Sequence, residues 1–322
     1  MNILVTGAGG MIGTAVVSSA AASAWSVESL RTHVGTLSAD GRPAEALSPG
    51  PSVACDITDL DALRPVAEGA DVVIHLAAPP SVAASFAAPS EFLRAHVLGT
   101  ATVVELCRQL AIPRLVYLSS AEVYGRPTRN PVDESAPLAP RSPYAAAKVG
   151  AESVIGAAVR AGVLDAVVLR PFSVYGPGAR REGVLGLILE QARTGHHIRL
   201  RKLDGIRDYC YVDDLAAAVW RAATSGLTGI HTFNVASGTG TRVDELARAT
   251  LAARYGGLPA DASVEALPAG GADGDRPSAA DIDELIGDVA RARDELGWTA
   301  TTSLADGLAR TLDWFAATAT GG

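Results

Sequence analysis

The chain of 322 residues has little of what marks several large classes of protein. Its three cysteines, Cys55, Cys107 and Cys210, are too few and too far apart for a disulfide framework or a zinc cluster. We expect each of them to be a small buried residue, and we predict no metal site. A formal net charge of −8 argues against a surface that binds nucleic acid or an anionic membrane. No apolar run is long enough to span a membrane and no basic leader precedes a cleavage site, so we expect a cytoplasmic protein.

Aromatic residues are also scarce, at 5% of the chain, whereas apolar residues as a whole reach 48%. Much of the apolar content is alanine, which suits helices packed closely against a sheet. A chain of this length can form one large domain or two modest ones. We therefore expect an α/β protein with a sizeable core.

A glycine-rich turn stands between the first strand and the first helix. The strand is Ile3-Leu4-Val5, and an apolar helical pattern begins a few residues later. Glycines in such a turn let backbone N–H groups approach a pyrophosphate, and the helix N-terminus favours its negative charge. The pattern alone is weak evidence, but its place after the first strand strengthens it. It predicts a dinucleotide contact at Gly7, Gly10, Met11, Ile12 and Gly13.

Strand and helix patterns then alternate, which predicts a doubly wound parallel Rossmann sheet. The expected further strands are residues 27–31, 53–57, 72–78, 115–120 and 166–170, and the helices between them include 58–68 and 90–110. Beyond residue 171 the alternation breaks down, with helices at 184–194 and 212–223, a strand at 230–235 that returns to the main sheet, and small helices after 238. We predict a Rossmann domain of residues 1–171 joined by 212–236. Residues 172–211 and 237–322 form a smaller, mostly C-terminal substrate-binding region.

Two positions bear on the adenosine end of the cofactor. The second predicted strand ends at Arg31, where a Rossmann fold usually offers a carboxylate to the ribose. An arginine there suits a ribose 2′-phosphate, so it favours NADP(H) over NAD, although a solvated arginine is the alternative reading. Asp56 lies near the end of the third predicted strand and could accept a hydrogen bond from the adenine amino group.

The segment from Ser142 to Lys148 predicts the start of a helix, because the serine can cap it and Pro143 suits its first position. Tyr144 and Lys148 then lie four residues apart on one face. A free phenol titrates near 10, so a nearby ammonium would make it a usable proton donor and acceptor. Taken alone, the pair is more simply an ordinary helix face. Ser120, at the carboxyl end of the fifth predicted strand, lies where open α/β sheets hold their ligands.

These features occur in one order along nearly the whole chain, and the chain resembles the extended short-chain dehydrogenases/reductases, in the NAD-dependent epimerase/dehydratase branch that acts on nucleotide sugars. The motifs that carry the resemblance are Gly7/Gly10/Gly13, Asp56-Ile57, His75-Leu76-Ala77-Ala78, the run from Ser119 to Gly125, Tyr144/Lys148, the run from Arg170 to Gly178 and the run from Arg207 to Asp214.

The resemblance implies roles for these residues. Tyr144 would take a proton from a sugar hydroxyl while hydride leaves the same carbon, and Lys148 would bind the nicotinamide ribose and lower the pKa of Tyr144. Ser120 would hold the reacting oxygen, and Arg207 would grip the diphosphate of the nucleotide sugar. The remaining implied cofactor contacts are Asp56, Ile57, Leu76, Ala77, Ala78 and Pro171, and the remaining substrate contacts are Ala121, Glu122 and Ser173. The family also suggests a homodimer joined through helices 90–110 and 144–159.

Four departures from the family pattern keep alternatives open. Arg31 replaces the usual acid, His96 stands where asparagine is usual ahead of Gly99-Thr100, and Ser173 replaces another asparagine. The adjacent Asp-Glu pair of the 4,6-dehydratases is Ala121-Glu122 here, so an ordinary 4,6-dehydratase is disfavoured and Glu122 is either a general acid/base or a structural acceptor.

We therefore expect a nucleotide-sugar 4-epimerase, a class that favours tightly held NAD, with Tyr144 as its acid/base. The alternatives are an NADPH-dependent 4-ketoreductase, which Arg31 favours, and a dehydratase assisted by Glu122. A non-catalytic NAD(P)-sensing binding protein is a minor alternative.

Overall fold

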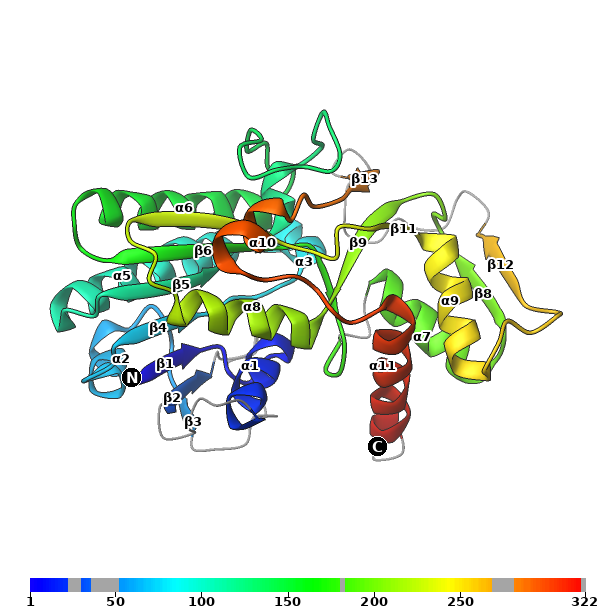
Figure 1. The fold of residues 1–322 in the computed structure, drawn as a ribbon, viewed down its shortest axis with the longest axis horizontal. Coiled ribbons are helices and arrows are strands. Elements are labelled where there is room, and N and C mark those ends of the chain that lie inside the picture. The colour runs from blue at the N-terminus through cyan, green and yellow to red at the C-terminus, as the bar shows by residue number, and fades with distance from the viewer. Residues whose placement is uncertain (23–29, 36–51, 180–182, 268–280, 320–322) are drawn as a thin grey trace.

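The computed structural model describes residues 1–22, 30–35, 52–179, 183–267 and 281–319. Its centre is a seven-stranded sheet in which every neighbouring pair is parallel (Figure 1). The predicted doubly wound fold is thus confirmed. The strand predicted at residues 230–235 pairs with β6 and so returns to the main sheet, as expected. In spatial order the strands are β10 (Ile230–Val235), β6 (Asp165–Pro171), β5 (Arg114–Leu118), β4 (Val72–His75), β1 (Ile3–Thr6), β2 (Leu30–Gly35) and β3 (Ser52–Ala54).

Helices cover both faces of this sheet because successive strand side chains point to opposite sides. Ile3 and Val5 join a cluster with α1 (Met11–Ala22) and α8 (Val212–Thr224). Leu4, between them, joins the opposite cluster, to which α2 (Leu60–Ala67), α5 (Gly99–Leu110) and α6 (Pro143–Arg160) contribute.

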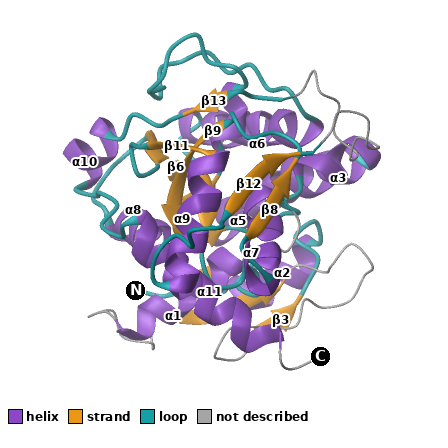
Figure 2. Cartoon of the chain, turned by 90° about the vertical axis from the view of Figure 1, so that its right-hand side faces the viewer, coloured by secondary structure: helices purple, strands orange, loops and turns teal. Residues whose placement is uncertain are grey.

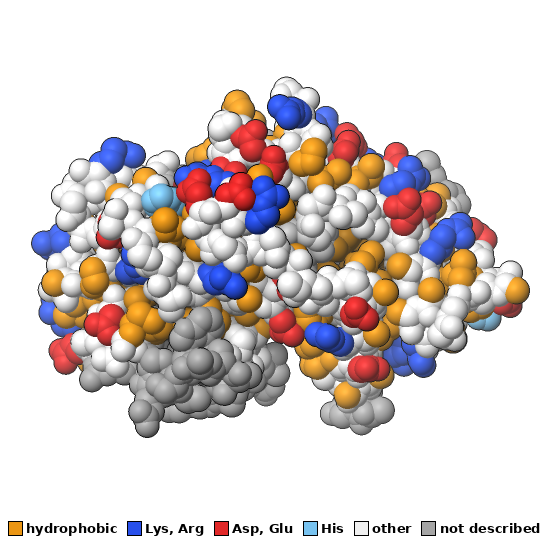
Figure 3. Space-filling model, in the orientation of Figure 1, with side chains coloured by type: hydrophobic (Ala, Val, Ile, Leu, Met, Phe, Trp, Pro, Cys, Tyr) orange, Lys and Arg blue, Asp and Glu red, His pale blue; other side chains and the backbone are white. Residues whose placement is uncertain are grey.

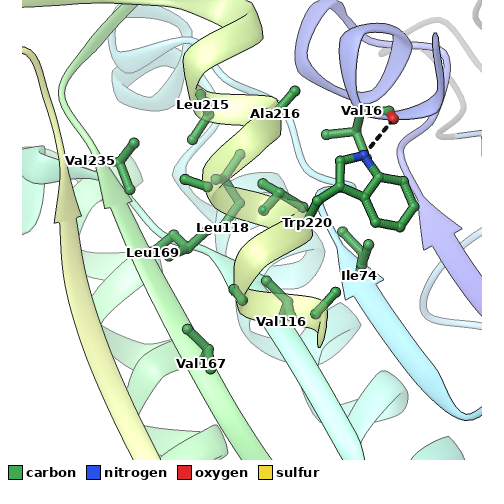
Figure 4. Packing of buried hydrophobic residues seen from close by; sticks show 14 of the residues in the cluster. Val16, Ile74, Val116, Leu118, Val167, Leu169, Leu215, Ala216, Trp220 and Val235 are labelled. Carbon is green, nitrogen blue, oxygen red and sulfur yellow. Dashed lines mark hydrogen bonds between the residues drawn. The ribbon is translucent and has the colours of Figure 1, made fainter. Parts of the chain in front are cut away.

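Trp220 fixes α8 against α1 on the first of these faces. Its side chain is fully buried, and its indole Nε1–H donates to the Val16 carbonyl oxygen at 2.9 Å (Figure 4). Fully burying a large apolar side chain contributes roughly 1.5–3 kcal/mol, and the hydrogen bond satisfies its polar atom. The contact holds the helix that follows the glycine turn in a fixed place.

The predicted helix 90–110 exists, but it is not a regular α-helix. It consists of α4 (Pro89–Leu93), a π-helical segment η2 (Arg94–Leu98) and α5, preceded by the short α3 (Val82–Ala87). A π-helical segment inserts a residue into the turn and often marks a functional site. His96 lies in this segment.

Most of the elements that do not belong to the main sheet or to the helices that cover it lie together at one end of the molecule (Figures 1 and 2). β9 (Ile206–Tyr211) pairs there with β7 (Ser173–Tyr175), β11 (Gly240–Arg242) and β13 (Glu284–Leu285), and β8 (His197–Leu200) pairs with β12 (Ser263–Ala266). The helices at this end are α7 (Val184–Thr194), α9 (Val243–Tyr255) and α11 (Leu304–Ala319), whereas α10 (Ala290–Leu296) packs in the core beside α8 and the main sheet. A short 3₁₀ turn, η3 (Ala121–Tyr124), follows β5. Helices occur after residue 238 as predicted, but the prediction missed strands of two to four residues, which are too short to show an alternating pattern.

Two strand boundaries also differ from the prediction. β2 runs from Leu30 to Gly35, so Arg31 is its second residue and not its last. The side chain of Arg31 lies outside the described part of the structure. β3 ends at Ala54, two residues before Asp56.

On the face of the molecule shown in Figure 3, acidic and basic side chains are interspersed.

Candidate active site

A cavity of about 610 Å³ opens at the carboxyl edge of the main sheet. It lies where β1 and β4 are neighbours and the chain winds away in opposite directions, which is the place where open α/β sheets bind ligands. Most of the predicted cofactor and catalytic residues line it. These are Gly7, Gly10, Met11, Ile12, Gly13, Leu76, Ala78, Ser120, Tyr144, Lys148 and Pro171.

The glycine turn has the shape that a pyrophosphate needs. Gly7 has φ of +77°, and a Cβ there would lie 2.7 Å from the Ala77 backbone nitrogen. A Cβ on Gly13 would lie 2.2 Å from the Gly7 carbonyl oxygen, so these two glycines are required by the fold itself. A Cβ on Gly10 would meet only that oxygen, at 3.6 Å. The space beside Gly10, next to the N-terminus of α1, is therefore open to a ligand, and these residues fit a dinucleotide.

Tyr144 and Ser120 come together at the floor of this cavity. Ser142 caps α6 by accepting from Ala145 N at 3.1 Å and Pro143 occupies the first turn, which confirms the predicted helix start. Burial raises the pKa of Tyr144 to about 12, a hydrogen bond with the Ser120 side chain opposes this rise, and the charge of Glu122 adds to it. The phenol and the hydroxyl, 24 positions apart in sequence, thus lie beside the same cavity, near enough for the hydroxyl to affect the pKa of the phenol.

Lys148 is buried one helical turn after Tyr144. Its Nζ donates to the Leu118 carbonyl oxygen at 2.6 Å and lies 4.8 Å from the ring centroid of Tyr117, against 6.0 Å from that of Tyr144. Burial lowers the pKa of Lys148 to about 7, and Glu152 opposes this change.

The expectation that Lys148 lowers the pKa of Tyr144 stays a prediction. The raised pKa of Tyr144 shows that the burial of its phenol outweighs any such effect, and Lys148 itself loses charge through burial.

An ion pair that was not predicted lies behind this site. Glu152 accepts from Arg170, with 2.7 Å between Oε2 and Nη2, and its other oxygen accepts from the Ser119 hydroxyl. Arg170 also donates to the Tyr124 hydroxyl oxygen at 2.9 Å. The ion pair joins α6, the helix of Tyr144, to the carboxyl end of β6, which carries Arg170.

A smaller cavity of about 50 Å³ adjoins the first. All five predicted substrate residues line it: Ser120, Ala121, Glu122, Ser173 and Arg207. The Arg207 guanidinium is held by the carbonyl oxygens of Ile206, at 2.9 Å, and Ile282, at 2.6 Å. Its orientation is therefore set by the backbone.

Three predicted cofactor residues support the site without lining it. Asp56 accepts from the Thr58 backbone nitrogen at 2.8 Å and from Arg94 at 2.7 Å. Ile57 is buried beneath Gly99, and Ala77 is buried beneath Gly7. Residues that the prediction did not assign also line the main cavity: Pro79, Pro80, His96, Phe172, Val174, Gly178, Ala179 and residues 183–186. Of these, Phe172, Val174 and Gly178 belong to a motif of the family resemblance, and His96 carried a signal as a departure from the family pattern.

Within the described ranges, no three His, Cys, Asp or Glu side chains cluster in a way that could hold a metal ion. The three cysteines are free and buried, as predicted. Among the helices that the structure describes, none combines the length and apolar character of a membrane span.

A glycine turn at the switch point of a Rossmann sheet, with serine, tyrosine and lysine around one cavity, defines a dehydrogenase/reductase type of site. Residues 3–236 match the model of the NAD dependent epimerase/dehydratase family. The chain belongs to this family.

Its relatives include enzymes of two kinds. The UDP-glucose 4-epimerase of Mycolicibacterium smegmatis is 32% identical over 321 residues, which is 98% of each chain. The solved UDP-glucose 4-epimerase of Thermotoga maritima with UDP-glucose superposes with a TM-score of 0.84 at 27% identity, covering 99% of this chain and 100% of that one. The dTDP-glucose 4,6-dehydratase DesIV of Streptomyces venezuelae, solved with NAD bound, gives a TM-score of 0.85 at 27% identity and covers 99% and 98%.

Proposed function

We propose that the protein is a nucleotide-sugar 4-epimerase in which Tyr144 is the acid and base at C4. The observation that carries this proposal is that the side chains of Ser120, Tyr144 and Lys148 line one dinucleotide-sized cavity, together with the glycine turn. A hydroxyl placed between Ser120 and Tyr144 would give up its proton to the phenol oxygen while Ser120 holds the charge that develops.

The cofactor supplies the redox step. A bound nicotinamide ring would accept hydride from C4 and return it to the other face of the same carbon, with no net consumption. Such a ring is positively charged when oxidised, and a positive charge beside Tyr144 favours its phenolate form. Tyr144 needs this help, because burial, with a smaller contribution from the charge of Glu122, raises its pKa to about 12.

Residue 121 favours epimerisation over dehydration. A 4,6-elimination needs one group to protonate the leaving hydroxyl and another to remove the C5 proton. The small cavity offers Glu122 but has Ala121 at the adjacent position. Because Glu122 and Ser120 line the same cavity, an elimination assisted by Glu122 is the second candidate.

We propose NAD as the cofactor. The argument for NADP(H) placed Arg31 at the carboxyl end of the second strand, but that end is Gly35. The bound dinucleotide of the DesIV structure is also NAD. The nucleotide sugar would then bind beside the residues that line the smaller cavity, with Arg207 on its diphosphate and residues 172–211 and 237–322 around it.

We also propose a homodimer formed through the α4–η2–α5 segment and α6. Leu93 and Leu98, on the first of these, are 46% and 51% exposed. Large apolar side chains exposed on one helical segment suit a partner helix. Sedimentation of the purified protein would test this arrangement.

The reaction itself is tested with a UDP-linked hexose that carries deuterium at C4. An epimerase returns the label to C4 of the product, because the hydride that leaves is the hydride that comes back. Transfer of the label to C6 with a 4-keto product would select the elimination. Steady consumption of NADPH with a 4-keto sugar nucleotide would select a reductase, and binding of NAD without turnover of UDP-, dTDP- or GDP-sugars would favour a sensor.

A further inference from the structure

His96 is a buried histidine to which the proposed function assigns no catalytic or binding role. It lies in the π-helical segment η2, is 1% exposed, and lines the main cavity with Tyr144 and Lys148. Its ring meets the Tyr144 ring edge-on, with 5.3 Å between centroids and 85° between planes. It also stacks on Phe92, at 5.9 Å. The ring therefore has one orientation in the site.

The hydrogen-bonding state of this ring follows from its partners. Nε2 lies 3.1 Å from the Pro79 carbonyl oxygen, which can only accept, so Nε2 carries the proton. Burial, with a smaller contribution from the nearby Lys148 charge, lowers the pKa of His96 to about 2, so the ring is neutral. Nδ1 is then a bare acceptor, and it is buried without a hydrogen-bond partner among the described residues. A buried acceptor left unpaired is costly, which points to a donor that arrives with a ligand.

The chemistry of Lys148 indicates which donor this is. In its charged form, which a bound ligand hydroxyl would favour by accepting from it, Lys148 can only donate, and one of its three hydrogens goes to the Leu118 carbonyl oxygen. A ligand hydroxyl that accepts from Lys148 keeps its own hydrogen and needs an acceptor nearby. His96 Nδ1 offers a lone pair in the same cavity.

We propose that Nδ1 of His96 accepts a hydrogen bond from a hydroxyl of the ribose next to the nicotinamide, so that His96 is a further cofactor-binding residue. This inference rests on the dinucleotide site of the proposed function, but not on which reaction the protein catalyses. Direct binding measurements therefore test it separately from turnover.

The first test compares wild type with His96→Phe, which keeps an aromatic ring against Tyr144 and Phe92 but has no acceptor. The ligands are NAD and an analogue whose nicotinamide-side ribose lacks both hydroxyls, and titration calorimetry gives the affinities. We expect the variant to bind NAD about 3- to 10-fold more weakly than wild type, the worth of one hydrogen bond, and to bind the analogue as wild type does. His231→Phe, a histidine outside the cavity, is the matched control and should bind both ligands as wild type does.

The second test needs no variant and so does not depend on how His96→Phe folds. In wild-type protein labelled with ¹⁵N-histidine, the unprotonated Nδ1 signal of His96 should shift on addition of NAD and stay in place on addition of the analogue. An equal effect of both ligands, or no effect of NAD on this signal or of the variant on NAD affinity, would overturn the inference and leave the proposed function standing. Failure of wild type to bind NAD at all would overturn both.

Discussion

Glu152 and Arg170 form an ion pair with 2.7 Å between their charged atoms, and their side chains are only 10% and 7% exposed. Glu152 follows Lys148 by one helical turn on α6, and it also accepts from the hydroxyl of Ser119, which precedes Ser120. Glu152 thus links α6, the helix of Tyr144 and Lys148, to β6 through Arg170 and to the end of β5 next to Ser120 through Ser119. Because the ion pair is buried, removing either charge would leave the other charge buried without a counter-ion.

Replacing Glu152 with glutamine should destabilise the protein by about 3–5 kcal/mol, because Arg170 is left buried without its counter-ion. Urea denaturation measures this free energy. Glu105→Gln is the matched control: Glu105 pairs with Arg108 at 2.6 Å, but both side chains are exposed, so little change is expected. Equal effects of the two substitutions would show that burial does not set the importance of the pair.

The stability of the protein without ligand should depend on pH through Lys148. Burial lowers its pKa from 10.5 to about 7, so between these values the unfolded chain holds a proton that the folded chain has released. The free energy of unfolding contributed by this group therefore rises with pH across that window.

Lys148→Met removes this term. The stability of the variant relative to wild type should be greatest below pH 7 and should decline as the pH rises towards 10.5. Denaturation of both proteins over this range measures the difference. A difference that does not change with pH would mean that Lys148 titrates normally in the folded protein.

Alanine substitutions in the glycine turn should separate folding from binding. Gly13→Ala would place a Cβ 2.2 Å from a backbone oxygen, so it should lower the midpoint of thermal unfolding. Gly10→Ala has room in the turn, where its Cβ would meet only the Gly7 carbonyl oxygen at 3.6 Å, so the protein should fold as wild type does. It should bind NAD at least tenfold more weakly, because the methyl group takes space beside α1 that the pyrophosphate needs. Wild-type affinity for NAD in Gly10→Ala would place the pyrophosphate elsewhere.

Glu122→Gln should leave the protein active, with a rate within about tenfold of wild type, because Tyr144 carries the proton in an epimerase. The negative charge of Glu122 contributes to the raised pKa of Tyr144, so its removal should lower that pKa. The acidic limb of the pH–rate profile should then move to lower pH. Complete loss of turnover would instead make Glu122 an acid/base and support the elimination.

The features that the sequence predicted well are those with local causes. The glycine turn after β1 and the Ser142 cap with Pro143 are set by neighbouring residues, and each is found where it was expected. The helix predicted at 184–194 coincides with α7 for a similar reason, since its apolar pattern is uninterrupted.

Other features depend on distant parts of the chain and could not be predicted. The partners Glu152 and Arg170 are brought together only by the packing of α6 on the sheet. The π-helical turn around His96 has no sequence signature of its own, and the unpaired Nδ1 becomes visible only once Pro79 is known to bind Nε2. The position of Arg31 within its strand depended on a boundary, which is the least certain part of any sequence-based assignment.

Turnover of a UDP-hexose by Tyr144→Phe tests the central claim most directly. We predict a rate at least a hundredfold below wild type, with NAD affinity and thermal stability retained, because only the proton-transferring oxygen is removed. Tyr255→Phe, at a tyrosine 43% exposed outside the cavity, should have the wild-type rate. Wild-type turnover by Tyr144→Phe would contradict the account.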